Sequence, residues 1–189
     1  MTFSVFNVKV KVSYLFVSAL TLMLFLKENT TLFFCILFSL FHECGHLVLM
    51  HVLGANLSEI SFEVFGISIK SQSISALSTL KRIAVFSGGV MANLIFAFLN
   101  FHPKINLSLA LFNILPIGWL DGGRIMFEIL TSLFGERAGD IIHSIISFLV
   151  LSVFSFLVFS AIRINFSASV VLVYLLLSVL FKKRMLKCY

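Results

Sequence analysis

Long apolar runs separated by short polar stretches dominate the chain. A helix needs about 20 apolar residues to cross the hydrocarbon of a bilayer. Six runs approach or exceed that length, at residues 12–26, 31–53, 83–101, 105–130, 141–162 and 166–181. The pattern predicts an all-α polytopic membrane protein with about six transmembrane helices.

A different period appears between the second and third runs, in residues 57–70. Here Ile60, Phe62 and Val64 alternate with polar residues, which is the period of a half-buried strand. After Gly66 the register of the apolar residues changes, as it does at a turn or bulge. We expect a small membrane-associated β-hairpin, and a merely structural interfacial loop is the alternative.

Composition agrees with a membrane location. Of the 189 residues, 60% are hydrophobic and 12% charged, and the mean hydropathy is +1.10. Soluble domains average about 25% charged residues. No repeat, linker or low-complexity stretch divides the chain, so residues 1–189 are predicted to form one integral membrane domain.

The net charge of +6 raises the question of nucleic-acid binding, but the basic residues lie at the ends of apolar runs. With six spans both termini share one side, and eleven of the fourteen Lys and Arg residues fall there; the other three are Lys27, Lys104 and Arg163. Cytoplasmic loops of membrane proteins are enriched in Lys and Arg. We therefore expect a multi-pass protein of the cell membrane with cytoplasmic termini, and no nucleic-acid partner. Three cysteines in such a chain make a disulfide framework improbable.

The second run contains the sequence His42-Glu43-Cys44-Gly45-His46. On a helix the two histidines share one face and can bind one zinc ion. Glu43 is then placed to act as a general base toward a water molecule. Ionisable residues inside a membrane span are costly and usually functional. A polar cluster that hydrogen-bonds neighbouring helices is the alternative.

Catalytic zinc needs a third protein ligand and an open position. Asp121 is the best candidate, because it follows Pro116 in the fourth run and Gly122 and Gly123 follow it. Proline breaks a helix, and a broken helix in a membrane must be buried in protein or line a cavity. Alternatively, Asp121 caps the following helix or pairs with Arg124.

A third cluster lies in the third run, at residues 87–93. Gly88 and Gly89 permit close helix packing, which is the interpretation that we favour for both. Asn93 could hydrogen-bond across helices or reach the backbone of a substrate.

The HECGH sequence followed two spans later by NILPIGWLDGG resembles the site-2 protease family of intramembrane zinc metalloproteases. The similarity covers roughly residues 42–128. Without an inserted PDZ-like domain, and with the sequence LPIGWLDGGR, the chain is most similar to the stage IV sporulation protein FB type. We expect no CBS domain of the kind common in that type, and Val90 follows Gly89 where the family usually has proline.

The resemblance implies one zinc ion per chain, held by His42, His46 and Asp121, with Glu43 as the catalytic base. It also implies that Asn113 and Asn93 bind substrate, that the hairpin engages it, and that the catalytic core spans residues 31–130. The expected substrates are membrane-associated or membrane-spanning proteins, with a pro-sigma or anti-sigma factor as one case. Inhibitory membrane proteins are further expected partners, and the sporulation-like character favours a bacterial source.

Two other functions remain open from the sequence. One is a different HExxH membrane metalloprotease, whose third ligand is a downstream glutamate such as Glu128 or Glu136. The other is an inactive metal-binding membrane adaptor. The first requires that Asp121 be dispensable for metal, and the second that Glu43 be dispensable for function.

Overall fold

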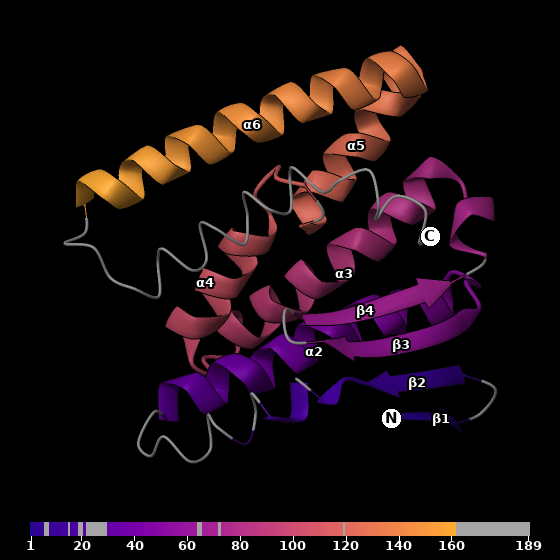
Figure 1. Ribbon diagram of the computed structural model, residues 1–189, viewed down its shortest axis with the longest axis vertical. Coiled ribbons are helices and arrows are strands. Elements are labelled where there is room, and N and C mark those ends of the chain that lie inside the picture. The colour runs from indigo at the N-terminus through magenta and orange to yellow at the C-terminus, as the bar shows by residue number, and fades with distance from the viewer. Residues whose placement is uncertain are drawn as a thin grey trace.

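The computed structural model describes residues 1–5, 8–14, 16–18, 21, 30–63, 66–71, 73–118 and 120–161. Helices dominate, and a small sheet lies beside them (Figure 1). The helices are α2 (Thr30–Val52), α3 (Thr79–Phe98), α4 (Pro103–Asn113), α5 (Asp121–Phe134) and α6 (Glu136–Ala161). The strands are β1 (Thr2–Val5), β2 (Val8–Val12), β3 (Leu57–Glu63) and β4 (Gly66–Ser71), and a short 3-10 helix, η1 (Ile74–Ala76), precedes α3.

Three of the helices are long and apolar enough to cross a membrane. The candidate spans are Phe33–Val52, Thr79–Phe98 and Glu136–Phe156. They correspond to the second, third and fifth apolar runs of the sequence. Two of them begin earlier than their runs, because α3 and α6 each start with a turn of polar residues. Glu136 therefore belongs to the first turn of α6.

The fourth apolar run is not one continuous helix. It folds as α4 and α5, with a non-helical connection between Asn113 and Asp121. Gly118 in this connection has a left-handed φ of 51°, a conformation that suits glycine. The break predicted from Pro116 is thus confirmed, and Asp121 stands at the start of α5.

The predicted hairpin is confirmed but is only half of the sheet. β3 and β4 are antiparallel, and β2 pairs in parallel with β3, so that the order is β1-β2-β3-β4. No strand was predicted before the first apolar run, and the predicted start of that run at residue 12 is wrong, because Val12 ends β2. The repeating pattern Val8-Lys9-Val10-Lys11-Val12 is the strand signal that was missed.

Two predicted spans are not tested by these elements. Most of run 12–26 and all of run 166–181 lie outside the described residues. The number of six spans therefore stays a prediction. What the described part of the chain contains is a mostly helical membrane protein with a four-stranded sheet.

Helix α3 contacts α2, α4 and α5, and α6 packs on α5. In Figure 1, α6 lies at the opposite end of the molecule from the sheet. Gly45 of α2 and Gly88 of α3 face each other: a Cβ atom on Gly88 would lie 2.6 Å from the Gly45 carbonyl oxygen. Small residues let helix backbones approach closely in membranes. This contact confirms the packing role predicted for Gly88 and brings the face of α2 that carries the histidines onto α3.

Candidate metal centre

The two histidines of α2 lie one turn apart on the face that packs against α3. Their side chains are buried, with 5% of His42 and 7% of His46 exposed. The His46 Nδ1–H donates to the backbone carbonyl oxygen of Val85 at 2.8 Å, a direction fixed by the fact that a carbonyl only accepts. His46 Nε2 is therefore left to face His42 and Asp121 in the interior of the site.

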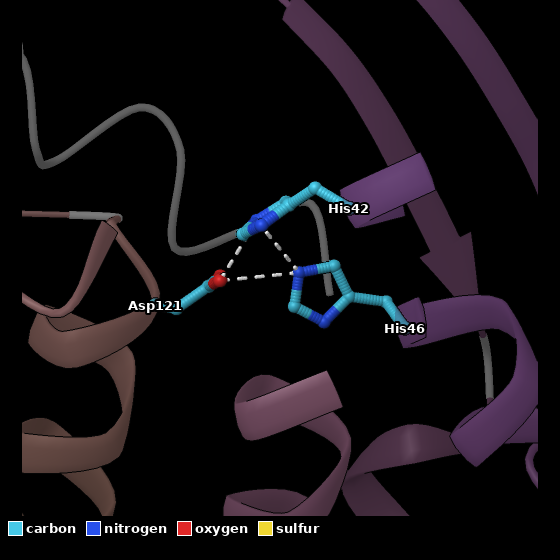
Figure 2. A group of neighbouring side chains, drawn as sticks. All are labelled: His42, His46 and Asp121. Atoms are coloured by element: carbon cyan, nitrogen blue, oxygen red, sulfur yellow. Dashed lines mark hydrogen bonds and ion pairs between the residues drawn. The ribbon is translucent and has the colours of Figure 1, made fainter. Parts of the chain in front are cut away.

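Asp121 reaches the histidines from α5. Gly122 and Gly123 directly after it pack against the backbone of the α4–α5 connection; a Cβ atom on Gly123 would lie 2.5 Å from the Gly118 carbonyl oxygen. The turn can therefore fold tightly back on the start of α5. Asp121 is 5% exposed, and Figure 2 shows its carboxylate pointing at both imidazoles.

Three potential ligand atoms form a small triangle. Asp121 Oδ2 lies 3.0 Å from His42 Nε2 and 3.2 Å from His46 Nε2, and the two Nε2 atoms are 3.3 Å apart (Figure 2). Zinc bonds of about 2.0–2.1 Å in a tetrahedron place neighbouring ligand atoms about 3.3–3.4 Å apart. The observed spacing is close to that required by a single ion.

The chemistry of this triangle also fits a cation. A neutral His46 that donates through Nδ1 presents the lone pair of Nε2 to a carboxylate oxygen. In a buried setting two electron-rich atoms so close together are unfavourable unless a positive charge lies between them. The residues present therefore fit a divalent metal ion with two imidazole ligands and one carboxylate ligand.

Glu43 is next to this cluster but outside it. Its side chain is partly buried, and it interacts electrostatically with His42, His46, Asp121 and Arg124. Arg124 itself lies 5.6 Å above the ring centre of Phe86.

The rival ligands named from the sequence lie elsewhere. Glu128 accepts hydrogen bonds from Arg82 Nε and Nη2 at 2.8 and 2.7 Å, and Glu136 is exposed at the start of α6.

The other histidines also lie outside the cluster. His51 is exposed, and the ring of His102 packs on the ring of Phe34. His143 is buried but packs edge-to-face on Phe127. Among the described residues, the cluster that could hold a metal ion is His42, His46 and Asp121.

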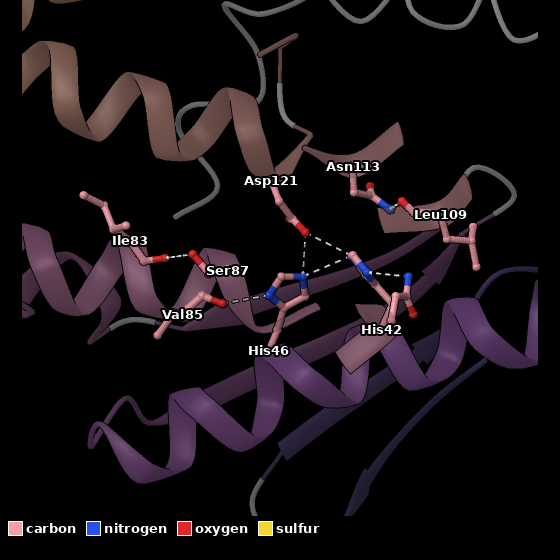
Figure 3. Close-up of polar contacts among 9 residues, drawn as sticks. His42, His46, Ile83, Val85, Ser87, Leu109, Asn113 and Asp121 are labelled. Atoms are coloured by element: carbon pink, nitrogen blue, oxygen red, sulfur yellow. Dashed lines mark hydrogen bonds and ion pairs between the residues drawn. The ribbon is translucent and has the colours of Figure 1, made fainter. Parts of the chain in front are cut away.

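The two asparagines have different settings. Asn113 is the last residue of α4, is partly buried, and donates through Nδ2 to the Leu109 carbonyl oxygen at 3.0 Å (Figure 3). Asn93 is completely buried, and its Nδ2 lies 3.2 Å from His42 Nδ1. The hydrogen bond across helices that the sequence left open for Asn93 is thus present.

Gly89 is the residue of this site that sequence reasoning missed. A Cβ atom there would lie 2.5 Å from the Nε2 atoms of both histidines. Packing between helices was the predicted reason for the glycine pair, and it holds for Gly88. Helical spacing could have distinguished the roles of the two glycines. Gly89 lies four residues from both Val85 and Asn93, so it shares their face of α3.

Comparison with known proteins agrees with the fold and the site. Residues 67–159, just under half of the chain, match the sequence profile of peptidase family M50. The fold is similar to the solved structure of a site-2 protease from Methanocaldococcus jannaschii, with a TM-score of 0.69 and 16% identity over 96% of this chain and 94% of that one. Over residues 67–159 the chain is therefore similar to peptidase family M50. No curated protein matches the chain.

The matched segment contains Asp121, Asn93 and Asn113 but not the HECGH sequence. The tertiary structure adds the HECGH sequence to the site, because α2 places both of its histidines beside Asp121. Family and geometry together identify a metalloprotease with a buried His-His-Asp metal site.

Proposed function

We propose that this protein is an intramembrane zinc metalloprotease in which His42, His46 and Asp121 bind one zinc ion and Glu43 is the catalytic base. The observation that carries the proposal is the triangle of buried ligand atoms, with sides of 3.0, 3.2 and 3.3 Å. When bound, zinc would supply Lewis-acid activation of water and polarise the scissile carbonyl group.

The side chains have separate tasks in this reaction. Glu43 takes the proton of the attacking water and later delivers a proton to the leaving amine, as a general base and then a general acid. Burial of the site excludes bulk water, which strengthens the electrostatic interactions of each charged group. His42, His46 and Asp121 hold their positions through α3 and the α4–α5 connection.

The substrate class follows from where the site lies. His42 and His46 are inside the candidate span Phe33–Val52, at or past its middle. A peptide bond that reaches them must enter the protein at membrane depth, so the substrates that we propose are membrane-associated or membrane-spanning proteins. Substrate binding by Asn113 is part of this proposal, supported by its position at the break that leads to Asp121. The sporulation type, the sigma-factor substrates and the inhibitory partners stay predictions of the sequence.

The competing third ligand is disfavoured by geometry. Glu128 is ion-paired with Arg82, whereas Asp121 contacts both histidines. Zinc content of the detergent-purified protein separates the two assignments. We expect about one zinc per chain in the wild type and in Glu128→Ala, and almost none in Asp121→Ala. Full zinc retention by Asp121→Ala would overturn the assignment of the site.

A second measurement separates an enzyme from an inactive metal-binding adaptor. Glu43→Gln keeps the size of the side chain but cannot accept the proton, so we expect normal zinc content and a loss of cleavage of at least about a hundredfold. The assay would compare a tagged single-span protein and an unfolded soluble protein as substrates, with and without chelator. Cleavage by Glu43→Gln at the wild-type rate would show that the catalysis has another source.

A further inference from the structure

Helix α3 contributes no ligand to the metal cluster, yet it contacts the outer nitrogen of both imidazoles. The Val85 carbonyl oxygen accepts from His46 Nδ1–H at 2.8 Å (Figure 3). Asn93 is also on α3, and its Nδ2 lies 3.2 Å from His42 Nδ1. Each ring is therefore held through Nδ1, and each Nε2 faces Asp121.

The spacing of these contacts is the helical repeat. Val85, Gly89 and Asn93 are four residues apart and form one stripe on α3. His46 and His42 are four apart on α2, and they meet this stripe in the reverse order. The polar contacts stand at its two ends, and Gly89 leaves room for the Nε2 atoms between them.

Asn93 is the side chain in this stripe whose chemistry goes beyond packing. It is completely buried, and its Oδ1 has no hydrogen-bond partner among the described residues. Burial of an unsatisfied amide oxygen is costly, and in Asn93, unlike the equally buried Asn106, the amide lies beside a ring of the metal cluster. A histidine that binds metal through Nε2 carries its proton on Nδ1 and needs an acceptor there. The asparagine amide can supply that acceptor by turning its oxygen to the ring.

We infer that Asn93 is a positioning residue that orients His42 for metal binding, and that it does so from the same stripe of α3 that orients His46. This inference rests on the proposed function. It assigns Asn93 a role through His42, in place of the direct contact with substrate that the family resemblance implied. Partners of metal-binding histidines typically change metal affinity 10–100-fold when removed.

The test is zinc affinity of the full-length protein in detergent, measured by competition with a chelating dye. Asn93→Ala is expected to bind zinc about 10–100-fold more weakly than the wild type. Asn93→Asp keeps an acceptor of the same size and is expected to bind at least as tightly as the wild type. Cobalt(II) is the second probe, since its visible absorption reports ligand geometry: we expect an altered spectrum for Asn93→Ala and a wild-type spectrum for Asn93→Asp.

Asn106→Ala is the matched control. Asn106 of α4 is also completely buried, and its Nδ2 donates to the Phe101 carbonyl oxygen at 2.7 Å, a contact that involves no residue of the metal cluster. Its loss should lower thermal stability and leave zinc affinity and the cobalt spectrum unchanged. If Asn93→Ala does not fold, Asn93→Ser replaces it, because a helical serine can bond to its own helix as Ser87 does to Ile83; the same weakening is expected.

The outcomes are distinct. Wild-type zinc affinity in Asn93→Ala or Asn93→Ser would overturn the inference while the proposed function stands. Equal weakening by Asn93→Ala and Asn106→Ala would also overturn it, since the effect would then be one of general stability. A wild-type protein that binds no zinc would overturn the proposed function itself.

Discussion

His42, His46 and Asp121 are costly residues at membrane depth, and each is kept in place by a different neighbour. Val85 and the Asn93 amide contact the outer nitrogens of the two rings. Asp121 depends instead on backbone shape, because it follows a broken helix directly. At the scale of residues, the site consists of three ligand side chains and a larger group of side chains and backbone atoms that orient these ligands. Substitutions in that second group should reveal which contacts control metal binding.

Gly89→Ala is the sharpest steric test of this arrangement. The added Cβ would lie 2.5 Å from both Nε2 atoms, so either the rings or the metal must move. We expect zinc affinity to fall about tenfold or more. The neighbouring Gly88→Ala is the control: its Cβ meets the Gly45 carbonyl, so thermal stability should fall more than zinc affinity. Wild-type zinc binding by Gly89→Ala would show that the imidazole rings can accommodate a Cβ at this position without loss of the metal site.

Among the elements, the α4–α5 connection decides where Asp121 stands. Ile117 and Leu120 in this connection are buried with Leu151 of α6. Ser147 of α6 donates through Oγ to the Pro116 carbonyl oxygen at 3.2 Å and accepts from the Gly118 N–H at 3.4 Å. A break in a membrane helix leaves polar backbone groups that must find partners in the protein. Helix α6 supplies them, so it supports the site without contributing a ligand.

Ser147→Ala should therefore destabilise the fold. The loss leaves a partly buried carbonyl and a partly buried N–H less satisfied, at a cost of about 1–3 kcal/mol in the free energy of unfolding. Thermal unfolding in detergent, followed by circular dichroism, measures the change. Ser152→Ala removes an exposed hydroxyl that bonds only to Phe148 in its own helix, and it should unfold like the wild type. Indistinguishable melting of the two variants would argue against support of the break by α6.

For the whole molecule, the sheet limits the topology. β2 and β3 are paired in one sheet, so the N-terminus and the α2–α3 connection lie on the same side of a bilayer that α2 crosses. The opposite end of α3 leads to α4 through residues 99–102, which must lie on the other side if α3 spans. Together with the distribution of Lys and Arg, this supports the proposal that the sheet is cytoplasmic.

Single cysteines test that orientation in a variant without the native cysteines. Ser4, Ser75 and Lys104 are exposed and lie on β1, η1 and α4. A membrane-impermeant maleimide added to intact cells should label only Lys104→Cys, and permeabilised cells should allow labelling of all three. Opposite sidedness of Ser4→Cys and Ser75→Cys would contradict the pairing of β2 with β3. Labelling of both from outside, with Lys104→Cys protected, would reverse the orientation alone.

Local patterns were enough to predict the long helices, the hairpin and the ligands. Apolar length determines a membrane span, and the four-residue spacing of His42 and His46 determines that they share a helix face. Pro116 and the glycines after Asp121 marked the break. These features depend on near neighbours in the chain, so they can be read from the sequence. The strands β1 and β2 were missed because a short alternating segment becomes a strand only with a partner. β1 pairs with β2, and the other partner of β2, β3, lies more than forty residues away.

Only the tertiary structure decided which distant residues meet. Asp121 rather than Glu128 faces the histidines because α3 and the α4–α5 connection place it there, while Arg82 engages Glu128. The separate roles of Gly88 and Gly89, and the contact of Asn93 with His42, depend on how α3 is rotated against α2. Helix rotation is set by packing over the whole interface, which no local pattern encodes. The sequence therefore determined the ligand types and their chemistry, and the packing of α3 determined the geometry that makes them one site.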